Sequence, residues 1–100
     1  MKNEKIYELK AGRTAKVIIK GIPASDLSKV VIETEVLVKD QREEEFRPPI
    51  GLSHPKYWKL KRLTDEQSRK LQIQYSGLSD KQIRKAVGEF EKMLNQEVLS

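Results

Sequence analysis

The feature that most constrains this chain is the alternation of side chains from Val30 to Lys39. Successive side chains of a β-strand point to opposite faces of its sheet. The alternation therefore predicts a strand with one buried and one solvated face. The first face carries Val30, Ile32, Thr34, Val36 and Val38, and the second is marked by Glu33, Glu35 and Lys39.

Two further segments of the N-terminal half have strand character. Residues 6–9 are short and mixed in polarity and are followed by a turn at residues 11–13, which suits a first edge strand. Residues 14–20 alternate, with Ala15, Val17 and Ile19 on one face, and predict a half-buried strand. We expect this strand to stop at a turn over residues 21–26, because Gly21 permits unusual dihedral angles and Pro23 has no N–H for a sheet ladder.

The C-terminal half changes to helical periodicity. Residues 64–67 and 79–82 each have the form of a capping box, in which an N-terminal hydroxyl and a Gln side chain satisfy free amides at a helix start. They predict one helix over residues 65–75, ended by Gly77, and a second over residues 80–96. A short helical segment is expected after Ser53, around Trp58. The second helix has one wide apolar face made of Ile83, Ala86, Val87, Phe90, Met93 and Leu94.

The change of period predicts an α+β fold. We expect a small antiparallel sheet of about three strands in the N-terminal half, followed by two or three C-terminal helices. One hundred residues is a common size for a single domain, so residues 1–100 are assigned to one domain. Its parts are a β half (1–40), a connection (41–53) with a Glu43–Glu45 run expected to be a solvated turn, and a helical half (54–96). Phe46 and Ile50 are expected to anchor the connection to the core.

Composition narrows the possible chemistry. The chain has no cysteine and a single histidine, His54, and it has no phosphate-cradling glycine motif. Ser53 before His54 and Pro55 is typical of a helix cap with proline in the first turn, and we prefer that interpretation to a catalytic one. The sequence therefore predicts no catalytic residue, metal site or cofactor, and a protein that is not an enzyme.

The absence of cysteine suits a reducing compartment. No stretch approaches the roughly 20 apolar residues of a membrane span, and no signal-peptide pattern opens the chain. We expect a cytoplasmic protein without a membrane partner.

The net charge of +5 is concentrated in the second half of the chain. Residues 51–100 carry ten Lys and Arg against six Asp and Glu, whereas residues 1–50 carry ten against nine. Between residues 56 and 70, cations alternate with Tyr57 and Trp58, which suits phosphate contact together with base stacking. The simpler interpretation, which we favour for Trp58, is that this side chain is part of the core.

Residues 77–87, Gly-Leu-Ser-Asp-Lys-Gln-Ile-Arg-Lys-Ala-Val, resemble the turn and second helix of helix-turn-helix DNA-binding domains. The resemblance covers residues 65–92 only, and Ile73 stands where the motif prefers a small residue. It implies that Lys81, Gln82, Arg84 and Lys85 face DNA. Gly88 inside this helix suggests close approach by another backbone or a partner.

These features predict a non-enzymatic binding module whose basic C-terminal helices bind DNA or RNA. The alternative is a protein-interaction or self-assembly module, which would bind a protein partner or a second copy through a strand edge at residues 30–38 or through the apolar helix face. The candidate nucleic-acid-binding residues are Lys56, Lys59, Lys61, Arg62, Arg69, Lys81, Gln82, Arg84 and Lys85.

Overall fold

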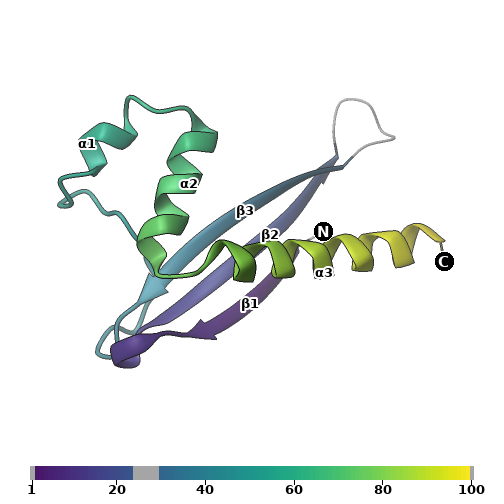
Figure 1. The fold of residues 1–100 in the computed structure, drawn as a ribbon, viewed down its shortest axis with the longest axis horizontal. Coiled ribbons are helices and arrows are strands. Elements are labelled where there is room, and N and C mark those ends of the chain that lie inside the picture. The colour runs from purple at the N-terminus through teal and green to yellow at the C-terminus, as the bar shows by residue number, and fades with distance from the viewer. Residues whose placement is uncertain (1, 24–29, 100) are drawn as a thin grey trace.

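A computed structural model describes residues 2–23 and 30–99, which form a three-stranded antiparallel sheet followed by three helices (Figure 1). The α+β prediction is confirmed. The strands are β1 (Lys2–Glu8), β2 (Thr14–Pro23) and β3 (Val30–Lys39). The helices are α1 (Tyr57–Leu60), α2 (Asp65–Ser76) and α3 (Asp80–Leu99).

The strands are arranged in the order β1-β2-β3, so β2 is central and the other two are edges. Ala15 of β2 pairs with Tyr7 of β1 and with Val38 of β3. The expected turn between β1 and β2 is a short 3₁₀ turn at Lys10–Gly12, where Gly12 has a φ of 74° that a glycine adopts without strain. β1 starts at Lys2, four residues earlier than predicted, because β2 is long enough to pair with it throughout.

The predicted stop of β2 at Gly21 is wrong, because the strand continues to Pro23. A Cβ on Gly21 would lie 3.1 Å from Val30 Cγ1 and 3.4 Å from Phe90 Cζ. Gly21 is therefore a strand residue whose lack of a side chain leaves room for the Phe90 ring of α3. The sequence suggested a turn at this position, but the glycine is required by close packing. The rest of that predicted turn, residues 24–26, lies outside the described residues.

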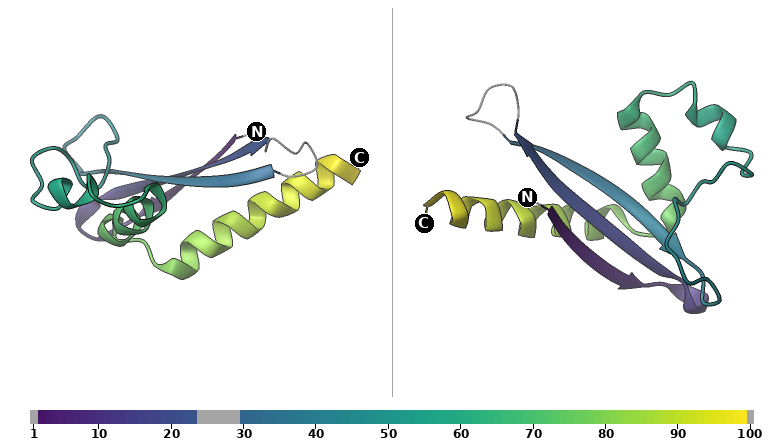
Figure 2. Two further views of the ribbon diagram at one scale, coloured as in Figure 1. Left: turned by 90° about the horizontal axis from the view of Figure 1, so that it is seen from above. Right: turned by 180° about the vertical axis from the view of Figure 1, so that it is seen from behind.

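Helix α3 covers one face of the sheet (Figure 2). Its side chains meet the apolar face that the alternation predicted, although Val30 at the end of β3 is half-exposed. Lys5 Nζ and Glu89 Oε2, 3.0 Å apart, add an ion pair between β1 and α3. This hydrogen bond raises the pKa of Lys5 and lowers that of Glu89. The buried core cluster consists of Ala15, Val17, Ile19, Val36, Val38, Leu78, Ile83, Ala86 and Phe90.

Helix α2 lies beside β3 and is held at its C-terminal end. Ile73 packs against the core, and Ser76 is fully buried. The Ser76 hydroxyl donates to the Ile73 carbonyl at 2.6 Å and accepts from the Leu78 N–H at 3.2 Å. Gly77, with a φ of 88°, ends the helix in the left-handed conformation, as predicted. The corner between α2 and α3 is thus fixed by buried hydrogen bonds.

Of the two residues expected to anchor the connection after β3 to the core, only Ile50 does so, because Phe46 lies outside the core cluster and outside the described hydrophobic residues packed against it. Ile50 is buried, and the Phe46 ring lies under the Lys16 ammonium, 4.4 Å from its centroid. In the Glu43–Glu45 run, Glu44 and Glu45 are exposed as predicted, and the half-exposed Glu43 carboxylate accepts hydrogen bonds from the Asp40 N–H and from Arg47. The Arg47 guanidinium is the main cause that lowers the pKa of Glu43.

Candidate nucleic-acid interface

Apart from Arg69 on α2, the predicted cations form two groups on different elements. Lys56, Lys59, Lys61 and Arg62 belong to the segment around α1, and Lys81, Arg84 and Lys85 belong to the first turns of α3. Helix α1 lies near the N-terminal half of α2, whereas α3 starts after the opposite end of α2 (Figure 1). The length of α2 therefore separates the two groups, and a ligand that contacts one does not automatically contact the other.

The segment around α1 is built by local hydrogen bonds. Ser53 does not cap this helix, which begins at Tyr57 with no side-chain cap. Instead, His54 Nδ1 accepts the N–H of Lys56, the residue just before the helix, at 3.0 Å. The His54 ring also meets the Tyr75 ring of α2 edge-on, with centroids 5.4 Å apart. The lone histidine thus positions α1 against α2.

Trp58 is not a core residue, so the favoured interpretation of its side chain is wrong. It is 71% exposed, and Leu52 in the same segment is 75% exposed. The helix that carries Trp58 is a single turn without a buried residue, so it presents little apolar surface to the core. An exposed indole among cations is available for stacking with a planar ligand.

The cations around Trp58 are not neutralised by the rest of the described chain. Lys56, Lys59 and Arg62 make no ion pair with any residue that the structure describes. The Lys61 ammonium lies 4.9 Å from the centroid of the Tyr57 ring. We call Lys56, Trp58, Lys59, Lys61 and Arg62 the α1 surface. It combines positive charge and an exposed aromatic ring on about one turn of helix.

A shallow groove of about 360 Å³ adjoins the α1 surface between α1 and α2. Lys59 and Lys70 supply cations to its lining, and Gln67 and Gln74 supply amides. Among the described residues, Lys70 makes an ion pair only with Glu66 of the same helix, 3.6 Å away. Both side chains are largely exposed, so a competing phosphate can displace Glu66. The contribution of the glutamines could not be found from sequence, because the groove exists only when α1 folds back on α2.

The α3 group is partly engaged. Lys81 and Lys85 are exposed and make no ion pair with described residues, whereas Arg84 Nη2 lies 2.8 Å from Asp80 Oδ2. The Gln82 amide oxygen accepts from the Ser79 N–H at 2.9 Å and completes the predicted capping box. Gln82 could read a base only by giving up this cap. Arg69 on α2 is likewise paired, with Glu33 of β3 at 3.1 Å.

The described residues contain no group of three or more potential metal-ligating side chains. Nor does any helix in that part of the chain have the length and apolar composition to cross a bilayer. Comparisons with protein-family models, with curated proteins and with solved structures gave no match.

Proposed function

We propose that this protein binds single-stranded nucleic acid through the α1 surface. The observation that carries the proposal is the exposure of Trp58 among cations without carboxylate partners in the described chain. Phosphates would contact Lys56, Lys59 and Arg62, and a base would stack on the indole. A duplex hides its base faces, so stacking on Trp58 favours single strands over duplex.

The helix-turn-helix resemblance makes a competing proposal that the same experiment tests. It assigns binding to Lys81, Arg84 and Lys85 and predicts a preference for duplex DNA. The α1 surface is better supported, because α3 uses Gln82 as a cap and its aromatic residue, Phe90, is fully buried.

The test is fluorescence anisotropy with labelled single-stranded RNA, single-stranded DNA and duplex DNA at several salt concentrations. One variant carries Lys56→Ala, Lys59→Ala and Arg62→Ala, and its matched control carries Lys81→Ala, Arg84→Ala and Lys85→Ala. Each variant loses three positive charges, so a general electrostatic effect weakens both equally. We expect single strands to bind with a log–log salt slope of roughly −2, corresponding to about three phosphate contacts.

The α1 variant should lose most of this binding, and the α3 variant should keep it. Equal losses of affinity in the two variants would mean that binding depends on net charge and not on the α1 surface. Loss confined to the α3 variant, with duplex bound best, would establish the helix-turn-helix proposal in its place.

A further inference from the structure

One edge of the sheet already carries the start of a fourth strand. The Val38 N–H donates to the Arg47 carbonyl at 2.7 Å, and the Arg47 N–H donates to the Val38 carbonyl at 2.8 Å. This antiparallel pair shows that the backbone groups of Val38 point away from β2. Because the direction of these groups alternates along a strand, those of Val36 and Thr34 point to the same open edge.

The chain does not continue this fourth strand. Pro48 and Pro49 follow Arg47, and proline has no N–H to donate to a ladder. The backbone then leaves the edge and is tied to α2 by the Ile50 N–H, which donates to Gln72 Oε1 at 3.0 Å. Outside the sheet, no hydrogen bond from the described residues reaches Thr34 or Val36. Two pairs of strand-forming groups thus remain open.

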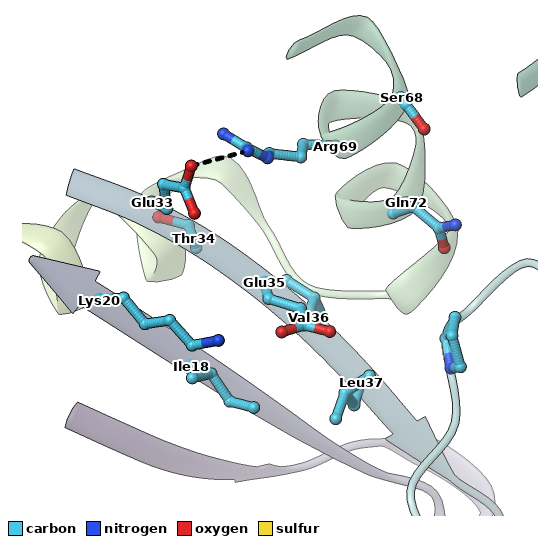
Figure 3. Close-up of a pocket in the computed structure, with 11 residues that line it drawn as sticks. Ile18, Lys20, Glu33, Thr34, Glu35, Val36, Leu37, Ser68, Arg69 and Gln72 are labelled. Carbon is cyan, nitrogen blue, oxygen red and sulfur yellow. Dashed lines mark hydrogen bonds and ion pairs between the residues drawn. The ribbon is translucent and has the colours of Figure 1, made fainter. Parts of the chain in front are cut away.

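A groove of about 340 Å³ lies beside these open groups (Figure 3). Val36 and Leu37 of β3 and Ile18 of β2 form its sheet side, and Ser68 and Gln72 belong to its α2 side. Helix α2 touches the core near Ile73, and the N-terminal end of α2 stands away from β3 (Figure 1). The groove therefore lies between an edge strand and a helix that stands away from it.

The charges of the groove indicate what it would accept. Glu33 is held by Arg69 across the groove, but Glu35 makes no ion pair with a described residue. Lys20 extends toward Glu35 without forming one (Figure 3). The Arg69–Glu33 pair is exposed on both sides, so it contributes little to stability and its separation costs little.

We propose that the open part of β3 accepts an extended peptide of a partner protein as an antiparallel fourth strand. The peptide exchanges backbone hydrogen bonds with Thr34 and Val36, places a basic side chain opposite Glu35, and places an apolar side chain near Leu37. Main-chain bonds supply the affinity, and the alternate side chains supply the selectivity. This inference is independent of nucleic-acid binding by the α1 surface.

The experiment is an NMR titration of the full ¹⁵N-labelled chain with a capped heptapeptide of alternating Thr and Val that has Lys at its centre. We expect the largest shifts at the Thr34 and Val36 amides, with slowed hydrogen exchange there. Two control peptides have the same length: one has Glu in place of Lys, and one is N-methylated at the residues that face β3. The N-methylated peptide should bind at least tenfold more weakly, and the Glu peptide several-fold more weakly.

A protein variant supplies a second arm. Thr34→Pro removes a donor from the open edge but none from the β2–β3 ladder, so it should lose peptide binding while keeping the spectrum of the folded chain. If it unfolds, the N-methylated peptide still tests the backbone bonds in the unaltered protein. Shifts at Glu4 and Ile6 of the β1 edge, equal binding of the N-methylated peptide, or no shift at millimolar peptide would overturn the proposal. Protection of Thr34 and Val36 that grows with protein concentration alone would assign the edge to a second copy instead.

Discussion

Similar residue types are buried in the interface between α3 and the sheet but exposed in the segment around α1. Phe90 and Trp58 are both large aromatic residues on helices, yet Phe90 is fully buried and Trp58 is 71% exposed. Helix α3 has twenty residues and an apolar face that meets the sheet, whereas α1 has four residues and no buried side chain. The exposure of an aromatic side chain on a helix therefore depends on whether the helix is long enough to present a continuous apolar face to the core.

Truncation of the buried Phe90 ring should change the stability of the protein more than any other substitution considered below. Phe90→Ala removes a side chain with no exposed surface and leaves a cavity against Gly21. We expect a loss of about 3–5 kcal/mol in the free energy of unfolding, which is typical of large core truncations. Urea denaturation followed by circular dichroism measures it. A loss below about 1 kcal/mol would mean that α3 is not packed on the sheet as described.

Truncation of the exposed ring should separate binding from stability. Trp58→Ala should change the free energy of unfolding by less than about 0.5 kcal/mol, as most surface substitutions do. It should weaken single-strand binding by about 1–3 kcal/mol, the usual value of one stacked base. Trp58→Phe is the control, because it keeps a π-face and should restore most of the affinity. Unchanged binding in Trp58→Ala would leave the α1 surface with charge alone.

Gly88 tests the packing of α3 from the other side. Apart from its chain neighbours and the backbone of its own helix, nothing in the described chain lies within 4 Å of a Cβ built on this residue. The close approach that the sequence suggested is therefore absent among the described residues, and Gly88→Ala should stabilise the protein by about 0.5–1 kcal/mol through helix propensity. Thermal unfolding of the variant tests this gain. A loss of binding to a partner without a loss of stability would show that the small residue serves an intermolecular contact.

The smallest expected effect is the pH dependence of the ion pair between β1 and α3. Glu89 has a lowered pKa in the folded state, so its contribution is present above the pKa of the unfolded chain and fades as pH falls through the folded value. The Lys5 pKa is raised, so its contribution is present below the unfolded value and fades as pH rises through the folded value above 10.5. Chemical denaturation across pH, with Glu89→Gln as the control, measures both limbs. The variant should flatten the acid limb and the alkaline limb together.

The parts of the fold that depend on local patterns were predictable. Both capping boxes are formed, α2 ends at Gly77, and β3 has the predicted bounds. The errors concern contacts between residues distant in sequence. Gly21 was interpreted from its conformational freedom, but its position is explained by Phe90, sixty-nine positions later. The exposure of Trp58 depends on how short α1 is, which the apolar residues around it did not reveal.

The candidate sites follow the same division. The cations of the α1 surface were visible in the sequence, but their lack of carboxylate partners in the described chain required the structure. The open edge beside α2 could not be found by spacing, because it depends on the pairing of Val38 with Arg47 and on where the chain then leaves the sheet. Periodicity predicts which face of a strand is buried but does not identify its neighbours.

The buried hydroxyl of Ser76 has a consequence for mechanics. It fixes the C-terminal end of α2 to the start of α3, while nearer the middle of α2 the Arg69–Glu33 pair is an exposed link to the sheet. The described contacts of α2 are therefore concentrated toward its C-terminal end, and α1 with its tryptophan lies near its N-terminal half (Figure 1). A peptide inserted beside β3 would displace the N-terminal half of α2, so occupancy of the groove should change the fluorescence of Trp58.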